Sequence, residues 1–235
     1  MSETTDHTSL GDRMKQNYEA PSRQFLPRRM PILLRVDGKA FHTFTRGMDK
    51  PFDMRLIGAM NDVAIALCEE VQGSQFAYVQ SDEVTLLLHN YKRLNTQPWF
   101  HGNVQKMTSV AASVAASVMS LEYGRHAFFD ARAFVLPEAE VCNAILWRQQ
   151  DATRNSIQML ARARYSHNQC DGKNCSELQE MCFQAGDNWN NLPTHLKRGR
   201  FILRDFAGQW VVDNEPPILT ENRAYVDRHL ATEEG

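Results

Sequence analysis

The fold is decided by the stretch Phe76-Ala77-Tyr78-Val79-Gln80-Ser81-Asp82-Glu83-Val84-Thr85-Leu86-Leu87-Leu88. Two runs of apolar, β-branched and aromatic residues flank a short polar centre, which is the pattern of two strands joined by a tight turn. A carboxylate is costly inside a sheet, so the acidic centre belongs at the turn. We therefore predict a β-hairpin with Ser81 and Asp82 at its tip.

Strands and helices can be assigned on both sides of this hairpin from the spacing of apolar residues. Pro31 to Val36 predicts a first strand, and apolar residues three and four apart between Asp53 and Val71 predict a helix. After the hairpin, Met107 to Val118 predicts a second amphipathic helix, and Phe128 to Leu136 predicts a fourth strand. This β-α-β-β-α-β order predicts an α+β fold of the ferredoxin-like type.

A second acidic motif, Arg35-Val36-Asp37-Gly38-Lys39-Ala40-Phe41-His42, follows the first strand directly. In the ferredoxin-like order, strands one and three are neighbours, so the exit of strand one lies beside the hairpin tip. We therefore expect Asp37 and Asp82 to approach each other, and two such carboxylates would suit Mg²⁺ and phosphoryl chemistry. Gly38 leaves room for a phosphate or for its own carbonyl to reach a cation. Each motif by itself is also an ordinary turn sequence.

The part of the chain after Pro137 reads as mainly helical. We expect two helices within 138–164 with a break near 151–155, then a helix over Ser176 to Phe183 capped by Ser176, and a final hairpin. The segment after Asn214 is polar and is expected to be peripheral. The predicted organisation is a disordered N-terminus over 1–9, a catalytic core over 10–137, and a helical and basic part over 138–235 packed on that core.

Composition narrows the class of protein. The chain has 235 residues, 43% of them hydrophobic and 23% charged, which is typical of a soluble globular protein. The net charge is −2, so RNA binding would depend on local basic clusters, of which the best candidates are Lys197, Arg198 and Arg200. Five cysteines without a disulfide framework indicate a reducing compartment, and no segment reads as a secretion signal or a membrane span, so a cytoplasmic location is expected.

Two further groups of residues invite a functional interpretation. His167, Cys170, Cys175, Cys182 and His195 contain zinc-ligand types, but no Cys-x₂-Cys knuckle is present, which disfavours a zinc site. Lysines are the other group. Candidate phosphate ligands are Lys50 and Lys106, the latter on a helix from which it could point towards the acids; an exposed lysine is the common alternative.

Several motifs together resemble the tRNAHis guanylyltransferase family: Arg35 to His42, Lys50-Pro51, Gln80 to Glu83, Phe129-Asp130-Ala131-Arg132, and Trp147-Arg148-Gln149-x-Asp151. The match extends from about Leu10 to Asp213. The resemblance implies a polymerase-palm fold, two Mg²⁺ ions, GTP and ATP as substrates, and nucleotide addition at a tRNA 5′ end in the 3′-to-5′ direction. It also implies a homo-oligomer, a tetramer in this family.

The same resemblance implies roles for individual residues. Asp37 and Asp82 correspond to catalytic, metal-bridging carboxylates, and Gly38 to a metal ligand through its backbone carbonyl. The nucleotide-binding residues would be Asp37, Gly38, Lys39, Ala40, Phe41, His42, Lys50, Ser81, Asp82 and Lys106.

Two departures from the eukaryotic members of the family bear on substrate choice. Thr153-Arg154-Asn155-Ser156 stands where those members have His-Ile-Asn-Asn, and Gly102-Asn103 stands where they have an arginine pair. Trp189 to Pro193 and Lys197-Arg198-Gly199 resemble the guanylyltransferase-like branch. We therefore predict templated repair of 5′-truncated tRNAs. Strict addition of one guanosine to tRNAHis, a nucleotidyl cyclase-like palm enzyme, and a non-catalytic RNA-binding module remain as alternatives.

Overall fold

The computed structural model describes residues 8–91 and 95–231. Within them the strands form a six-stranded sheet in the order β4-β1-β3-β2-β5-β6, and each strand is antiparallel to its neighbours. The first four strands thus have the predicted ferredoxin-like order, with β1 and β3 in the centre. The strand bounds are β1 Ile32–Gly38, β2 Ser74–Gln80, β3 Glu83–Leu88, β4 Phe129–Val135, β5 Arg200–Arg204 and β6 Trp210–Asp213.

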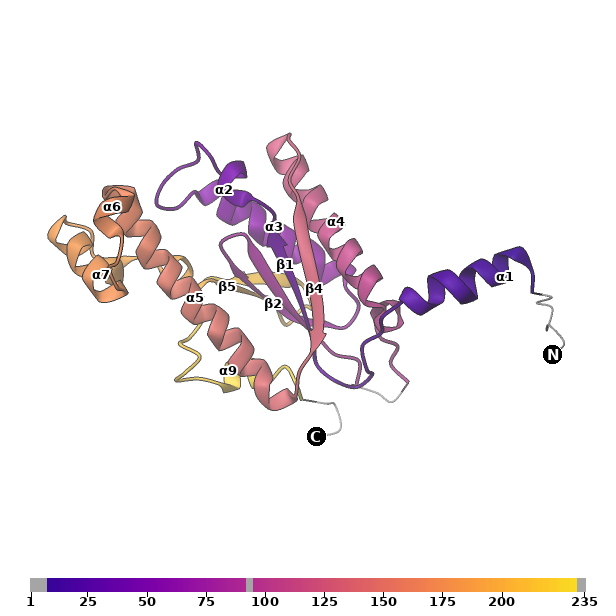
Figure 1. Cartoon of the computed structure of the whole chain (residues 1–235). Coiled ribbons are helices and arrows are strands. Elements are labelled where there is room, and N and C mark those ends of the chain that lie inside the picture. The colour runs from indigo at the N-terminus through magenta and orange to yellow at the C-terminus, as the bar shows by residue number, and fades with distance from the viewer. Residues whose placement is uncertain (1–7, 92–94, 232–235) are drawn as a thin grey trace.

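Helices cover both faces of the sheet (Figure 1). α3 and α4 pack on one face, and α5 crosses the other. The α-helix bounds are α1 Leu10–Met14, α2 Phe41–Phe44, α3 Met54–Glu70, α4 Val104–Tyr123, α5 Glu138–Arg164, α6 His167–Cys170, α7 Cys175–Gln184, α8 Thr194–Arg198 and α9 Ala224–Asp227. In the parts of the chain that the structure describes, no helix has both the length and the apolar composition that a membrane span requires.

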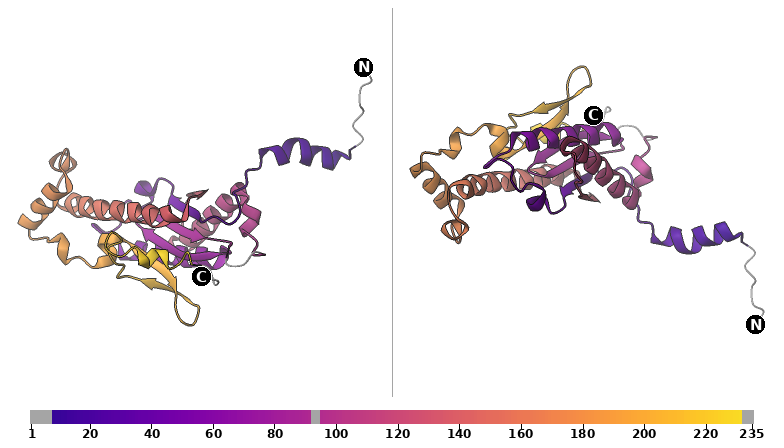
Figure 2. Two further views of the ribbon diagram at one scale, coloured as in Figure 1. Left: turned by 90° about the horizontal axis from the view of Figure 1, so that it is seen from below. Right: turned by 90° about the horizontal axis from the view of Figure 1, so that it is seen from above.

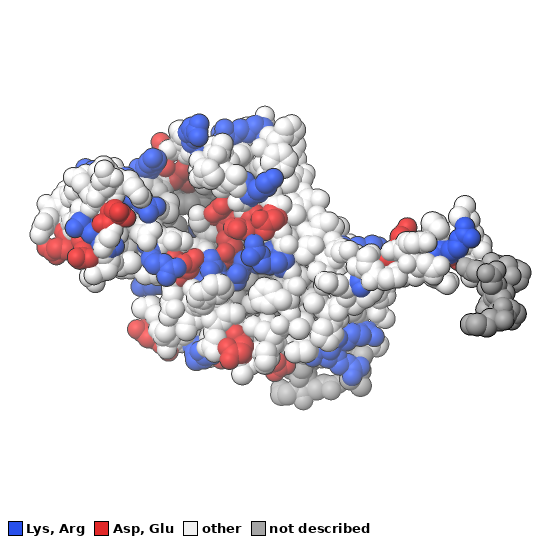
Figure 3. All heavy atoms as spheres, viewed as in Figure 1, with Lys and Arg blue, Asp and Glu red and all other residues white. Residues whose placement is uncertain are grey.

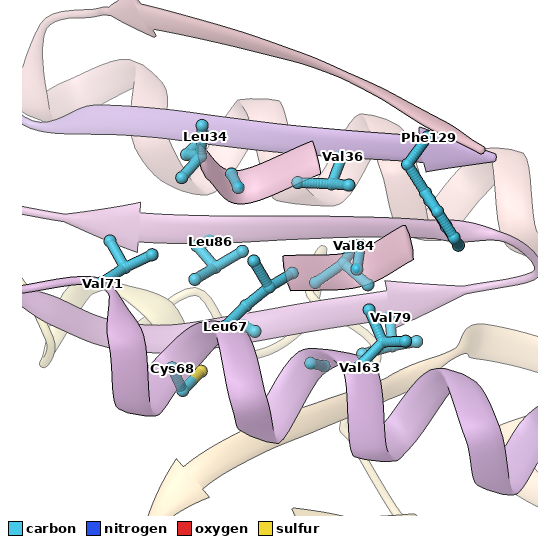
Figure 4. Close-up of a cluster of buried hydrophobic side chains, with 14 of the residues drawn as sticks. Leu34, Val36, Val63, Leu67, Cys68, Val71, Val79, Val84, Leu86 and Phe129 are labelled. Atoms are coloured by element: carbon cyan, nitrogen blue, oxygen red, sulfur yellow. The ribbon is translucent and has the colours of Figure 1, made fainter. Parts of the chain in front are cut away.

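Alternation along the strands creates a separate core on each face. Leu34 and Val36 on β1 belong to the core beneath α3 and α4, whereas Leu33 belongs to the core beneath α5. Figure 4 shows Leu34 and Val36 in the same cluster as Leu67 on α3. Successive side chains of a strand point to opposite faces, so a continuous apolar run such as this one requires helices on both sides.

The N-terminal segment stands away from the body of the protein (Figures 1 and 2). α1 begins after Ser9, whose side chain accepts the Asp12 N–H, and continues as helical turns to Ser22. None of its residues is buried. The predicted disorder over 1–9 concerns mainly residues 1–7, which lie outside the described residues.

The predicted break in the helix after Pro137 is wrong, because α5 runs unbroken from Glu138 to Arg164. Asp151 lies within hydrogen-bond distance of Arg148 and Arg154, each three residues away along the helix. The Thr153 hydroxyl donates to the Gln149 carbonyl at 3.0 Å. Packing and local pairing therefore outweigh the low intrinsic helix propensity of this stretch.

The predicted cap of the next helix is also wrong by two residues. Asn174, not Ser176, caps α7: its side chain accepts the Glu177 N–H at 3.1 Å, and the Glu177 carboxylate accepts the Asn174 N–H at 2.7 Å. This is a reciprocal capping box. Asn174 and Glu177 together satisfy two otherwise unpaired backbone N–H groups, which the pairing of Ser176 with Gln179 would not do at the observed start.

The segment after Asn214 is not peripheral. Leu219 and Val226 are fully buried in the core beneath α5. Gln149 on α5 fixes the segment, because its amide donates to the Pro217 carbonyl at 2.9 Å and accepts the Leu219 N–H at 3.0 Å. Because most of the surrounding residues are polar, the sequence pattern did not indicate that these two residues belong to the core.

Candidate active site

The exit of β1 lies directly against the tip of the β2–β3 hairpin. The Gly38 N–H donates to the Asp82 carbonyl at 3.1 Å, and Asp37 pairs with Glu83 in the register of β1 and β3. Ser81 at the tip has a φ of 47°, a left-handed conformation that non-glycine residues adopt mainly in tight turns. The expected approach of the two acidic motifs is therefore confirmed.

The site carries an excess of negative charge. Burial is the main cause that raises the pKa of Asp37 to about 6, and repulsion from Asp82, Glu83 and Asp130 adds to it. Burial also raises the pKa of Asp82. Figure 3 shows Asp and Glu side chains gathered in the middle of this face, with Lys and Arg side chains along their border. A bound cation would relieve this repulsion.

Glu83 is already neutralised by the protein. Arg148 on α5 donates from Nε and Nη2 to the two carboxylate oxygens, both at 2.7 Å, and Arg35 lies 3.6 Å away. All three residues are buried. Glu83 therefore anchors α5 to the sheet, while the neighbouring carboxylates remain for a ligand.

Asp130 is a further carboxylate beside Asp37. It faces Asp37 across β1 and β4 and receives an exposed hydrogen bond from Arg132 at 3.1 Å. Like charges directly opposite on neighbouring strands are unfavourable. This pair therefore adds to the negative charge that a cation bound beside Asp37 would neutralise.

The donor set fits Mg²⁺ held jointly with a nucleotide. In the described residues, no three His, Cys, Asp or Glu side chains converge as a ready-made metal site. Mg²⁺ is commonly held by one or two carboxylates together with substrate phosphates and water. Asp37 and Asp82, with the Gly38 carbonyl beside them, provide that smaller set of hard oxygen ligands.

The segment after Asp37 is shaped by Phe41. A Cβ at Gly38 would lie 2.2 Å from the Phe41 ring, so only glycine fits there. Phe41 is buried and stacks on Phe44, with ring centroids 4.9 Å apart. Its ring therefore belongs to the core, and a ligand could meet only the backbone of this residue.

The backbone amides after Asp37 are partly occupied. The Gly38 N–H bonds to Asp82, and the Lys39 N–H donates to the Phe128 carbonyl at 2.8 Å. These two amides could reach a phosphate only by giving up those bonds. Ala40, the N-cap of α2, has a φ of 54°. The Lys39 and His42 side chains on either side of the cap are exposed.

A mainly apolar pocket opens beside the hairpin tip, between the start of α3 and the middle of α5. Its walls include Leu56, Ile57, Ser81, Asn155, Met159 and His195. Apolar walls with a few polar groups suit a planar heterocycle. Lys50 is exposed two residues before Phe52, another wall residue.

Lys106 lies far from the acids, so the expectation that it points towards them is wrong for a single chain. It belongs to the first turn of α4, whose start is bonded to Gln24 and Leu26, ahead of β1. The helix reaches the acidic end of the sheet only at Tyr123, about 25 Å further on at 1.5 Å per residue. Lys106 instead lines a separate surface pocket with Arg23, Phe25, Phe100, His101 and Ser109.

The three basic candidates for RNA binding differ in exposure. Arg200 is 3% exposed, and its Nε donates to Asn61 at 2.6 Å, so the prediction that its side chain contacts RNA is wrong. Lys197 and Arg198 are half-buried on α8. The Lys197 ammonium donates to the Asn190 carbonyl at 2.8 Å.

Sequence reasoning quoted the motif residues Glu83, Arg148 and Asp130 but assigned them no role. A usable signal was present for the first two. Glu83 is on the strand face that also carries the buried Leu87, and Arg148 follows Val141 and Ile145 on the apolar face of α5. A buried acidic residue and a buried basic residue on facing elements indicate an ion pair, because burying either charge alone would be costly.

Comparison with known proteins gives a consistent result. The family model of tRNAHis guanylyltransferase matches residues 11–137, more than half of the chain. A probable tRNA(His) guanylyltransferase of Drosophila melanogaster is 28% identical over 194 residues, covering 74% of this chain and 66% of the relative. The tRNA(His) guanylyltransferase of Schizosaccharomyces pombe is 27% identical over 196 residues, covering 74% and 73%.

Solved structures agree with the sequence relatives. A bacterial tRNAHis guanylyltransferase-like protein in complex with ATP has 43% identity and a TM-score of 0.90, covering 95% of this chain and 99% of that one. A complex of such a protein with GTP has 41% identity and a TM-score of 0.86 over the same shares. The enzyme from Saccharomyces cerevisiae, at 20% identity and a TM-score of 0.73 over 91% and 99%, shares the fold. On these matches, the chain belongs to the tRNAHis guanylyltransferase family of nucleotidyltransferases.

Proposed function

We propose that the protein adds nucleotides to tRNA 5′ ends in the 3′-to-5′ direction, and that it repairs 5′-truncated tRNAs by templated addition. The observation that carries this proposal is the contact between Gly38 and Asp82, which places Asp37 and Asp82 together beside an apolar pocket. Two hard oxygen ligands next to an apolar recess that could hold a base are what a nucleotidyl transfer site needs.

The proposed reaction has two steps. An oxygen of the tRNA 5′-monophosphate first attacks the α-phosphorus of ATP or GTP, and the bond to pyrophosphate breaks. The 3′-hydroxyl of the incoming nucleotide then attacks the capped 5′-phosphorus, its proton passes to solvent, and the bond to the AMP or GMP leaving group breaks. Where the 5′ end already carries a triphosphate, pyrophosphate is the leaving group. Asp37 and Asp82, with the Gly38 carbonyl, would hold Mg²⁺, which when bound neutralises developing charge on the phosphate oxygens.

Other residues of the chain would bind and orient the nucleotide. The pocket between α3 and α5 would receive the base, with Ser81 at its rim and Asn155 in its wall. Three exposed side chains would meet the triphosphate: Lys39 and His42, which follow Asp37 in the chain, and Lys50, which precedes the pocket residue Phe52 by two positions. A lysine acts on phosphate as a mobile point charge, which suits a group that moves during transfer.

Template dependence is proposed because the chain lacks the eukaryotic His-Ile-Asn-Asn motif. Asn155 points into the pocket wall at that position, and Arg154 stands beside it on α5. Selection would then rest on base pairing, since a matched pair allows in-line attack and a mismatch disturbs it. The names of the curated relatives support the alternative, strict guanosine addition to tRNAHis.

Location and assembly are part of the same proposal. All five cysteines are free, which supports a reducing, cytoplasmic location. A homo-oligomer, a tetramer by family resemblance, is proposed as the working assembly. Light scattering on the purified protein would measure its mass directly.

The test is 5′ extension at nucleotide resolution. The protein is incubated with Mg²⁺, nucleoside triphosphates and several 5′-truncated tRNAs that differ in anticodon. We expect addition of the complementary nucleotide to each, ending when the acceptor stem is complete. Asp37→Asn and Asp82→Asn should abolish addition, and Asp171→Asn, which changes an exposed acid in the turn between α6 and α7, should not.

The other outcomes separate the alternatives. Addition of guanosine to tRNAHis alone, whatever the opposite base, would establish the strict activity. Release of a cyclic nucleotide would identify a cyclase, and RNA binding without extension would identify a binding module. Full activity of either site variant would refute the metal assignment.

A further inference from the structure

An exposed tryptophan lies beside the acidic site. Trp147 on α5 is 54% exposed. Its ring is backed by two cations: the guanidinium of Arg35 lies 5.2 Å from the ring centroid and that of Arg148 lies 4.6 Å from it. A large aromatic residue that is half in solvent beside an acidic site offers a flat surface on which a ligand can stack.

The contacts show which side of the ring is covered. Arg35 and Arg148 both also approach the buried Glu83, so they lie between the indole and the sheet. The exposed surface of Trp147 is therefore on the side away from these two arginines. Cations beneath an aromatic ring hold it in place, because they interact with the electrons of its face.

The ring is close to the proposed reaction centre. Arg35 precedes Asp37 by two residues on β1, so the two share a sheet face about 7 Å apart along the strand. Arg132 on β4 lies opposite Arg35 in the register of β1 and β4, and its side chain is 57% exposed. Arg154 follows Trp147 by seven residues, which places both on one face of α5, and its side chain is 55% exposed.

This combination suits a nucleic-acid base with an exposed face, such as the terminal base of a stem. A free aromatic face stacks on any base, and exposed arginines pair with flanking phosphates. The apolar pocket lined by Ala152, Asn155 and Met159 occupies a different side of α5. The base of the nucleoside triphosphate is proposed to enter that pocket, so the tryptophan face is left for the RNA.

We propose that Trp147, with Arg132 and Arg154, forms a stacking platform for the terminal base at the 5′ end of the RNA acceptor. The two arginines contact phosphates on either side of that base. The identity of the RNA rests on the function proposed above. The platform holds the 5′ phosphate beside Asp37 and takes no part in bond making.

The test uses a 5′-truncated acceptor-stem hairpin that carries 2-aminopurine as its 5′ nucleotide. Binding to the wild-type protein should quench 2-aminopurine fluorescence, because the base stacks on the indole. Trp147→Leu should remove the quenching and weaken hairpin binding about tenfold. Trp147→Phe should keep most of the affinity, and Phe183→Leu, which removes an exposed aromatic ring on α7, should leave both readouts unchanged.

Two measurements separate this platform from other roles of the residue. The KM for ATP should be unchanged in Trp147→Leu, and a raised KM with normal hairpin binding would overturn the proposal by assigning the ring to the nucleotide. Unchanged quenching in Trp147→Leu would overturn it directly. If that variant is unfolded, Arg132→Gln with Arg154→Gln should lower the salt dependence of hairpin binding, and an unchanged dependence would refute the platform.

Failure of the proposed function gives a different pattern. If binding quenches 2-aminopurine fluorescence through Trp147 but no tRNA is extended, the platform is supported and the proposed activity is refuted. If truncated tRNAs are extended equally well with and without Trp147, and quenching is also unaffected, the proposed activity is supported and the platform is refuted.

Discussion

Removing Arg148 should destabilise the protein more than removing any exposed arginine. Arg148→Met leaves the Glu83 carboxylate buried without its two hydrogen bonds of 2.7 Å. Both side chains are 9% exposed, so water cannot replace the lost partner. Breaking such a pair from one side costs about 3–5 kcal/mol.

The expected loss is about 3 kcal/mol, at the lower end of that range, because Arg35 remains 3.6 Å from Glu83 and can take over part of the pairing. For a chain of this length, that loss would lower Tm by about 6–12 °C. The double variant with Glu83→Met removes both charges and should recover much of the stability.

Urea unfolding at pH 7.5 measures these free energies. Arg154→Met is the matched control, because Arg154 also bonds Asp151 but is 55% exposed, and an exposed pair contributes less than about 1 kcal/mol. The ionic strength should matter little for Arg148→Met, because the Glu83–Arg148 pair is buried and poorly screened, whereas any effect of Arg154→Met should shrink in salt.

Two results would refute this reasoning. One is a loss below about 1 kcal/mol in Arg148→Met at pH 7.5, which would mean that the buried pair contributes no more than a surface pair. The other is a double variant, Arg148→Met with Glu83→Met, that is no more stable than Arg148→Met alone, since removing the uncompensated carboxylate must recover stability.

Three shorter predictions follow from the geometry. Gly199 has a φ of +76°, and a Cβ there would lie 2.6 Å from the Tyr78 hydroxyl. Gly199→Ala should therefore lower the free energy of unfolding in urea by about 2 kcal/mol or more. In the control variant Gly58→Ala on α3, the new Cβ meets no neighbour, so the change should be neutral or slightly stabilising. The pKa of Asp37 is raised to about 6 in the folded protein, so its charge destabilises the metal-free protein fully above that pH. Asp37→Asn should therefore stabilise the protein in EDTA at pH 8 by on the order of 1 kcal/mol for this half-buried group, measured by urea unfolding, and the gain should vanish below about pH 4. Lys197→Ala should lower the slope of log tRNA affinity against log salt by about one, and an unchanged slope would place the RNA elsewhere.

The sequence by itself determined the order of the elements and the meeting of the two acidic motifs. Apolar spacing and turn residues report locally on strands and helices, so the four strands of the ferredoxin-like order and the hairpin tip at Ser81 were predictable. Once that order is known, few topologies remain, and they place Asp37 beside Asp82. No knowledge of side-chain packing was needed for this step.

Only the tertiary structure decided where individual polar residues lie. Arg200 is buried, although the sequence suggested a cation that contacts RNA, and Lys106 stands at the end of α4 away from the acids, although the sequence suggested that it points towards them. Leu219 is buried because Gln149, far away in the sequence, satisfies the backbone around it. The unbroken α5 likewise depends on its neighbours. A periodic pattern describes one element, whereas the cost of burying a charge or an amide depends on the partner that another element brings to it.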